Sequence, residues 1–341
     1  PGNATDQGIE WESSDTSVVD VDTNGMVTML KRGNATITAT SASNRNESGT
    51  CEVEVAVSLP VVDGYRTIHS GIIAIDDIWG GPPTYDHSVT RTSDISVTSF
   101  AISETEVRYE LWYIVKEWGE RHGYSFENKG RAGSNGMSGA SLDDPTTDKD
   151  QPVTNVSWRD VVVWCNAYSE ITGREPVYRD SSNNVLRDSR HKGSTVSQST
   201  ANDVENLVVE TKIALYNGYR LPTETEWEYA ARGGVPSDDA ASAWAYDYAG
   251  GNTIGDVGWN VSNAEGKTHS VGWKPANSAG LYDMSGNVHE WCFDSQSTGS
   301  VYIYRGGCYN SGSLTTLLAR NSTTTNPSYV ANTIGFRPVC H

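Results

Sequence analysis

Two patterns of side chains divide the chain near residue 59, and each predicts a different kind of fold. Before that point apolar and polar residues alternate, as in "ATITATSA" and "CEVEVAV", and the turn signal "TNG" separates two such runs. Alternation with a period of two is typical of half-buried antiparallel strands. The residues predicted to share the buried face are Ile37, Ala39, Cys51, Val53, Val55 and Val57. Short strands at this spacing predict a small β-sandwich over residues 1–58.

From residue 59 to residue 341 the chain is rich in Trp, Tyr and Gly, and three helices can be recognised. The first is predicted over Glu104–Glu120, where apolar residues recur at helical spacing. The second begins after Ser157 as its N-cap. The third begins after Thr223, and Glu226 completes a capping box. The long Gly-rich stretches that follow indicate an irregular fold with functional loops. We therefore expect an α+β domain over residues 59–341.

Composition excludes several classes of function. A net charge of -18 argues against a nucleic-acid partner, because phosphate binding needs fields of Lys and Arg. No apolar run approaches the roughly 20 residues of a transmembrane segment. The five cysteines form no CxxC pair, so no zinc or thioredoxin-like motif is predicted, and their disulfide pairing stays open. Since the chain begins at Pro1 without a signal segment, we expect it to be processed or trimmed.

Separated blocks of the larger domain resemble one protein family. In order, they are "FAISETEVRYELW", "PVTNVSWRDVVVWCNAYSE", "YRLPTETEWEYAARGG", "GLYDMSGNVHEWCFD" and the terminal "RGG" and "GFR". Together they resemble the formylglycine-generating enzyme (sulfatase-modifying factor) family, which implies its elaborated C-type lectin fold. The stretch "IEWESSDTSVVDVDTNGMVTMLKRGNATITATS" resembles bacterial Ig-like (Big2) modules, which implies a spacer role for residues 1–58.

The resemblance does not by itself imply the family's enzymatic activity. The enzymes use two cysteines in a copper site, one shortly after the "RGG" block and one five residues later. Here the first place holds Ser311, and the stretch for the second holds Thr315 and Thr316. Hydroxyls do not replace the thiolates that Cu(I) requires. The related iron enzymes need three histidines, and the seven histidines here are scattered. An oxidase of the formylglycine-generating type, acting on a cysteine or thiol substrate, remains the alternative.

The segment from Cys308 to Thr333 is unusual in composition. It contains a single charged residue, Arg320, and no Lys, Asp, Glu, Gln, Met or Trp. Its layout between "RGG" and "GFR" resembles the variable regions of diversity-generating retroelement proteins of the treponemal type. That resemblance implies adenine-directed mutagenesis of AAC codons, which cannot yield Lys, Glu, Gln, Met or Trp. The alternatives are an exposed linker, in which missing Lys and Glu are harder to explain, or a structural envelope protein with a constant segment.

The resemblance implies a variable region over about residues 305–337, whose two ends are scaffold and whose middle forms a binding surface. The scaffold residues are Arg305, Gly306, Gly307, Ile334, Gly335, Phe336 and Arg337. Tyr offers rigid amphipathic contact area, and Ser, Thr, Gly and Asn offer adaptable hydrogen bonds, as in antibody paratopes. Leu314, Leu317, Leu318 and Ala319 are expected to pack inward. The positions predicted to be displayed are Tyr309, Asn310, Ser311, Ser313, Thr315, Thr316, Asn321, Ser322, Thr323, Thr324, Asn326, Ser328, Tyr329, Asn332 and Thr333.

The block "YDMSGNVHEW" carries the candidate metal ligands. By resemblance to the enzymes, a structural Ca²⁺ is expected at Asp283, Gly286, Val288 and Glu290, through two side chains and two carbonyls. Oxygen donors on a tight loop suit a hard cation. The alternative is a glycine turn in which a carboxylate caps backbone amides.

Together these features predict a non-catalytic ligand-binding protein with no catalytic cofactor. The expected ligand is a protein or a glycan on another cell or a host. The resemblance further implies a monomer on a bacterial surface, held as a lipoprotein by an anchor that precedes Pro1.

Overall fold

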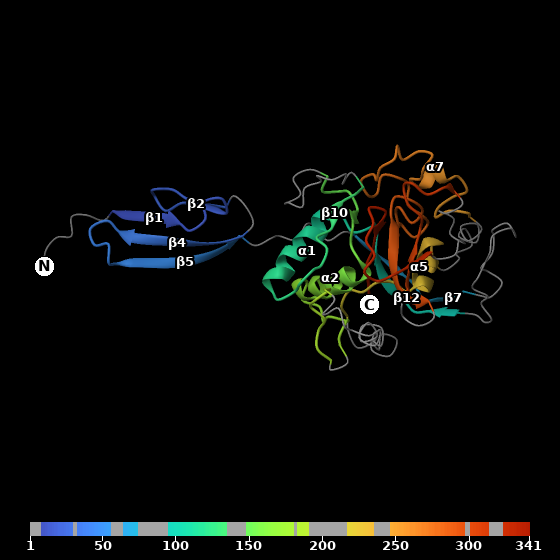
Figure 1. The fold of residues 1–341 in the computed structure, drawn as a ribbon, viewed down its shortest axis with the longest axis horizontal. Coiled ribbons are helices and arrows are strands. Elements are labelled where there is room, and N and C mark those ends of the chain that lie inside the picture. The colour runs from blue at the N-terminus through green and yellow to red at the C-terminus, as the bar shows by residue number, and fades with distance from the viewer. Residues whose placement is uncertain are drawn as a thin grey trace. The chain divides into compact units, whose positions relative to one another are not determined.

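The computed structural model describes residues 8–29, 33–55, 64–73, 95–134, 148–180, 183–190, 217–234, 246–296, 301–313 and 323–341. The chain divides into two compact units, Pro1–Leu59 and Pro60–His341. The division falls one residue after the predicted boundary. Figure 1 shows a small unit made of strands and a larger unit that contains both strands and helices.

The first unit consists of two small antiparallel sheets. Its strands are β1 (Ile9–Ser13), β2 (Val19–Val21), β3 (Val27–Met29), β4 (Gly33–Ser41) and β5 (Ser48–Val55). β4 lies between β1 and β5, and β2 pairs with β3. Val18 and Val19 pack on Ala35 and Ile37 of the central strand to form the core. Cys51 lies opposite Ile37 but is exposed, whereas Val53 and Val55 of the same strand pack against the core. Its predicted place on the buried face is therefore wrong.

The strands of the second unit are short and form several small sheets. They are β6 (Tyr65–Ile68), β7 (Gly71–Ile73), β8 (Ile95–Val97), β9 (Phe100–Ser103), β10 (Arg131–Ala132), β11 (Val153–Thr154), β12 (His289–Gln296), β13 (Val301–Arg305), β14 (Thr323–Thr325), β15 (Ile334–Gly335) and β16 (Val339–Cys340). One sheet has the order β14-β13-β12-β15, and another has the order β16-β9-β6. β15 runs parallel to β12, whereas β13 is antiparallel to both β12 and β14.

Capping residues define two of the helices of this unit. The described helices are α1 (Tyr109–Arg121), α2 (Trp158–Ile171), α5 (Glu224–Ala231) and α7 (Ile254–Val257). Ser157 caps α2 and Thr223 caps α5, each in a complete capping box, as predicted. α1 begins five residues later than predicted. The preceding chain forms β9 and a turn in which the Val107 amide donates to the Phe336 carbonyl.

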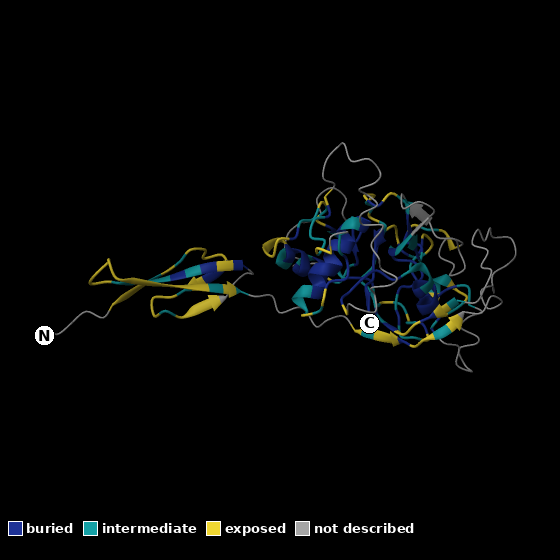
Figure 2. Cartoon of the chain, turned by 90° about the horizontal axis from the view of Figure 1, so that it is seen from below, coloured by how far each residue is buried: buried dark blue, intermediate teal, exposed yellow. Residues whose placement is uncertain are grey.

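The core of the second unit is aromatic. α1 and α2 lie to one side of β12 and α5 to the other (Figure 1), and the buried residues gather in the middle of the larger unit (Figure 2). Trp112 of α1 stacks on Trp164 of α2 with ring centroids 5.9 Å apart, and both rings meet Phe336 edge-on. Among the described residues, no helix is long and apolar enough to cross a membrane.

Candidate ligand-binding site

Both ends of the segment 305–337 are held by one strand, β12. Glu290 of β12 lies opposite Arg305 of β13 on one side and opposite Gly335 of β15 on the other. Neighbouring strands lie about 4.8 Å apart, so the two ends of the segment stay within roughly 10 Å of each other. Whatever lies between them must therefore leave and return at the same edge of the domain.

The first anchor is Arg305 together with two glycines. The guanidinium of Arg305 is buried, lies 3.2 Å from Glu228 and 3.6 Å from Glu224, and covers the ring of Trp227. The next two residues, Gly306 and Gly307, have φ values of 93° and 75°. Residues other than glycine rarely adopt such angles, so these glycines set the direction in which the segment leaves β13.

The second anchor is Arg337, which is fully buried. Its Nε and one terminal nitrogen each donate to a carboxylate oxygen of Glu290 at 2.7 Å. Its terminal nitrogens also donate to the carbonyls of Ser103, Glu104 and Tyr282. Bidentate guanidinium–carboxylate pairs are strong and geometrically specific. The preceding Phe336 lies in the aromatic core, so the predicted scaffold role of both residues agrees with their burial.

Most of the described candidate positions are accessible. Asn310, Ser313, Asn326, Ser328, Tyr329 and Asn332 are exposed, and Ser311 and Thr333 are half-buried. The amide of Ser328 donates to the Asn326 side chain, and the amide of Cys308 donates to the Ser311 hydroxyl. Side chains of the segment itself therefore stabilise a turn at each of its ends. Thr315, Thr316, Asn321 and Ser322 lie outside the described residues, as do Leu314, Leu317, Leu318, Ala319 and the side chains of Thr323 and Thr324.

Tyr309 requires a correction, because its side chain is only 6% exposed and is not displayed. Its backbone amide donates to the carbonyl of Asn287 at 2.7 Å. Tyr309 therefore holds the start of the segment to the loop that contains Asn287. Composition alone could not distinguish this tyrosine from the exposed Tyr329.

Three carboxylates are buried beneath the anchors. Glu106, Asp283 and Glu290 are each at most 2% exposed. Burial raises the pKa of Glu106 well above its usual range, and the neighbouring Asp283 and Glu290 raise it further. Burial also raises the pKa of Asp283 to about 6. The cluster therefore favours protons or a cation. The sequence reading missed Glu106, although it lies within the "SETEV" block, because 177 residues separate it from Asp283.

The predicted calcium ligands fit a metal ion only in part. Asp283 Oδ2 accepts from the Gly272 amide, while Oδ1 is buried without a hydrogen-bond partner, as a cation ligand would be. Both oxygens of Glu290 are bound by Arg337, and one also accepts from Trp227. Arg337 and Trp227 thus compete with a cation for Glu290, and only Oε1, which accepts one hydrogen bond, keeps a free lone pair. Among the described residues, no three His, Cys, Asp or Glu side chains form a group that could hold a metal. Calcium at Asp283, Gly286, Val288 and Glu290 stays a prediction.

The cysteine nearest the segment has the surroundings of a structural thiol. Cys308 is buried, and its Sγ lies 3.0 Å from Asn310 Oδ1 and 3.1 Å from Ser311 Oγ. Burial raises the pKa of the Cys308 thiol, so the thiol form is favoured over the thiolate. Reactive and metal-binding cysteines need the thiolate. Cys308 is therefore a buried thiol that lies against two polar side chains at the start of the segment.

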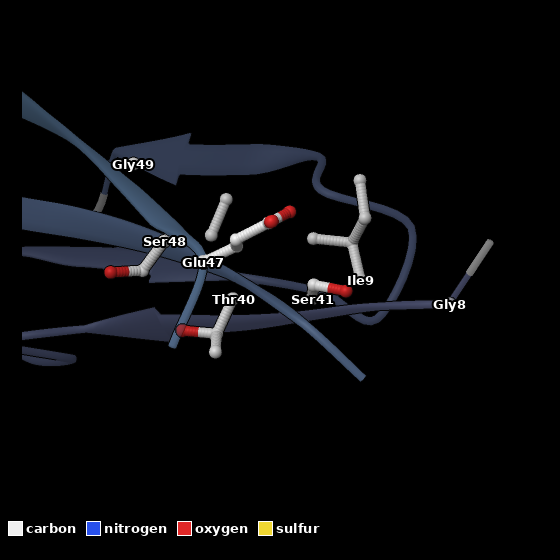
Figure 3. A pocket seen from close by; sticks show the side chains of 8 residues that line it. Gly8, Ile9, Thr40, Ser41, Glu47, Ser48 and Gly49 are labelled. Carbon is white, nitrogen blue, oxygen red and sulfur yellow. The ribbon is translucent and has the colours of Figure 1, made fainter. Parts of the chain in front are cut away.

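A hollow also lies on the first unit, at one end of the β1-β4-β5 sheet. Figure 3 shows small polar side chains, including Thr40, Ser41 and Ser48, beside Ile9. Ligand pockets usually combine an enclosed apolar lining with convergent polar groups. This open hollow lacks that combination, so the candidate site remains on the second unit.

Comparison with known families assigns both units. Residues 70–341 match the sulfatase-modifying factor enzyme 1-like domain, and residues 1–53 match the bacterial Ig-like domain of group 2. The chain belongs to the sulfatase-modifying factor family. Its second unit has the C-type lectin fold of the formylglycine-generating type, so the predicted fold class is confirmed.

Individual proteins resemble the chain to different extents. The structure of CarF is 27% identical, with a TM-score of 0.60, over 83% of this chain and 98% of its own. Treponema denticola variable protein 1 is 25% identical, with a TM-score of 0.57, over 81% of this chain and 94% of its own. The predicted resemblance to a treponemal variable protein is thereby confirmed. The chaperone protein LppX of Paenibacillus barcinonensis is 34% identical over 161 residues, 44% of this chain and 54% of LppX. The match thus spans about half the length of that relative.

Proposed function

We propose that the chain is a non-catalytic ligand-binding protein whose site is the segment 305–337. We further propose that retroelement-driven adenine mutagenesis diversifies this segment. The likeness to Treponema denticola variable protein 1 supports a diversified binding role. In this proposal the protein acts on a bacterial surface as a lipid-anchored lipoprotein, with the Ig-like unit as a spacer. Its ligand is a protein or a glycan on another cell or a host.

The observation that carries the proposal is the contrast between the anchors and the residues between them. Arg305 and Arg337 are buried in ion pairs, whereas Asn310, Asn326 and Tyr329 are exposed. A binding segment whose sequence varies needs anchors whose structure does not depend on the residues between them. Buried arginine pairs provide such ends, and exposed Asn, Ser, Thr and Tyr provide contacts that tolerate substitution.

The oxidase alternative receives no support from the described residues. The positions of the enzymes' cysteines fall at Ser311 and near Thr315 and Thr316, whose hydroxyls do not bind Cu(I) as thiolates do. The nearby Cys308 thiol is buried and its pKa is raised. We therefore do not propose an oxidase activity.

Deep sequencing of codons 300–341 in a dividing population of the source cells tests the proposal. We expect substitutions between positions 309 and 333, restricted to residues that AAC codons can reach, while 305–307 and 334–337 stay fixed. An invariant segment would contradict diversification in this copy. Substitutions that include Lys, Glu or Trp would contradict the adenine mechanism while leaving a binding role open.

A further inference from the structure

Beside the proposed site lies a group of rings that is outside the segment 305–337. This ring stack consists of Trp259, His269 and Trp273. Trp259 and His269 are stacked with centroids 3.7 Å apart, and His269 lies 6.4 Å from Trp273. The ammonium group of Lys274 covers Trp259 at 4.2 Å and donates to the Gly255 carbonyl. The three rings thus lie next to one another, and the neighbouring ammonium group already contacts Trp259 and the Gly255 carbonyl.

Backbone hydrogen bonds join the ring stack to the start of the segment. The amide of Val261, two residues after Trp259, donates to the Ser311 carbonyl at 3.0 Å. The amide of His269 donates to the Asn287 side chain, and the carbonyl of Asn287 accepts from the Tyr309 amide. The stack and the first displayed residues therefore keep a fixed spacing, whatever side chains the segment carries.

The outer ring of the stack is unusually exposed. Trp273 is 69% exposed, whereas every other tryptophan that the structure describes is buried or half-buried. Val261 is 58% exposed and Tyr329 is 46% exposed, so large apolar side chains lie both beside the segment and within it. Burying a tryptophan removes about 150–250 Å² of surface from water, which makes an exposed indole a strong contact for a partner.

The size of a protein interface requires more residues than the segment offers. A standard interface uses about 20–30 residues on each side. The segment has fifteen candidate positions, and one of them, Tyr309, is buried. A partner centred on the segment must therefore also cover constant residues. The ring stack is bonded to the segment and presents the kind of aromatic side chain that dominates interface energies.

We infer that Trp273, supported by His269 and Trp259, is the constant anchor of the binding surface and inserts into an apolar socket on a folded protein partner. This inference rests on the proposed function. A protein partner is favoured because exposed aromatic and apolar side chains, together with hydroxyl and amide groups, are the usual components of a protein–protein interface. The variable positions then supply specificity, and the indole supplies affinity that is common to all variants.

A display library tests the inference with the whole chain. The exposed segment positions are randomised with AAC-derived codons and selected against immobilised lysozyme as the protein probe, and against dextran as the glycan probe. The selection is made in the native background and with Trp273→Ala. The matched control is Ile72→Ala, which removes another exposed apolar side chain, 61% exposed on β7. Equal melting temperatures show that both variants remain folded.

We expect lysozyme binders from the native background to lose about tenfold or more in Kd with Trp273→Ala, while Ile72→Ala changes Kd by less than about twofold. Binders that arise equally in both backgrounds and tolerate Trp273→Ala would overturn the inference but not the proposed function. No binder in either background would overturn both. Dependence on Trp273 among dextran binders alone would overturn the assignment to a protein partner.

Discussion

At the scale of single residues, the ion pair between Arg337 and Glu290 fixes the C-terminal end of the segment to the domain. Arg337 is fully buried, and five hydrogen bonds fix it to Glu290 and to three backbone carbonyls. A buried charge that loses its partner is far more damaging than an exposed one. Arg337 also competes with any cation for the carboxylate of Glu290.

Arg337→Ala is expected to reduce the free energy of unfolding of the second unit by about 3–5 kcal/mol, because it leaves Glu290 buried and uncompensated. Urea denaturation followed by tryptophan fluorescence measures the loss. Arg190→Ala is the control, since Arg190 pairs with Asp188 at the surface and exposed pairs contribute about 1 kcal/mol or less. A loss below about 1 kcal/mol for Arg337→Ala would contradict the anchoring role.

The stability of the second unit should also depend on pH through Asp283. Aspartate in an unfolded chain titrates near pH 3.9, whereas burial raises the folded-state pKa of Asp283 to about 6. This contribution to stability is fully present below the unfolded pKa and is lost as pH rises through about 6. Relative to Asp283→Asn, the native chain should lose up to about 2 kcal/mol between pH 4 and pH 7.

Denaturant curves in the presence of a chelator, at several pH values, measure that difference. Asp256→Asn is the control for removing a carboxylate, because Asp256 is exposed. If the stability difference between the native chain and Asp283→Asn is constant from pH 4 to pH 7, the buried carboxyl does not titrate as expected.

Calcium binding at the same loop makes a separate prediction. Asp283 Oδ1 is buried without a hydrogen-bond partner, so millimolar Ca²⁺ should raise the melting temperature by binding only the folded chain. Asp283→Ala should abolish the rise, and Mg²⁺ should not replace Ca²⁺. No shift in the native chain would mean that Arg337 retains Glu290 and that this chain does without the metal.

At the scale of elements, β12 holds both ends of the segment through its pairing with β13 and β15. At Gly335, β15 also packs closely against β11. A Cβ at Gly335 would lie 2.5 Å from the Val153 carbonyl oxygen, which belongs to the backbone of β11. A Cβ at Gly312, within the segment, would meet no atom within 4 Å. The two glycines therefore differ in whether a side chain can be accommodated.

Gly335→Ala is expected to cost about 1–3 kcal/mol of stability, because strand backbone must shift to make room. Gly312→Ala is the matched control and should change stability by about 0.5 kcal/mol or less. Thermal unfolding of both variants compares them directly. Equal melting temperatures would show that the contact between β15 and β11 does not require a glycine at position 335.

The elements differ in how well the sequence predicts them. α2 and α5 start where Ser157 and Thr223 indicate, because a capping box is a local interaction. The start of α1 was misplaced because Val107 bonds to Phe336, far along the chain. The buried Tyr309 and the ring stack were missed for the same reason, since contacts between distant segments leave no periodic pattern. The motifs "RGG" and "GFR" located the two anchors, but no motif predicted that Glu106 lies beside Asp283.

At the scale of the whole molecule, the chain consists of two units with separate hydrophobic cores. One core is built on Val18, Val19, Ala35 and Ile37, and the other on residues that include Phe100, Trp227 and Leu281. The sequence located this division well because the period-two pattern ends where the first unit ends. Because the change in residue pattern extends over many residues, a wrong prediction for a few of them does not move the predicted boundary.

Deletion of residues 1–59 should leave the melting temperature of the second unit unchanged within about 2 °C, because each unit has its own core. Differential scanning calorimetry of the full chain and of residues 60–341 makes the comparison, and the full chain should show one additional transition. A large drop on deletion would show that the Ig-like unit stabilises its neighbour and is more than a spacer.

The closure of the segment on β12 also has a consequence for chain length. A loop whose ends are fixed loses little more entropy when it grows, with each doubling costing only about 0.6 kcal/mol. Since Glu290 lies opposite both Arg305 and Gly335, the two ends of an insert stay close together whatever its length. Peptides of quite different lengths could therefore be grafted between these ends, which makes the fold a scaffold for engineered recognition.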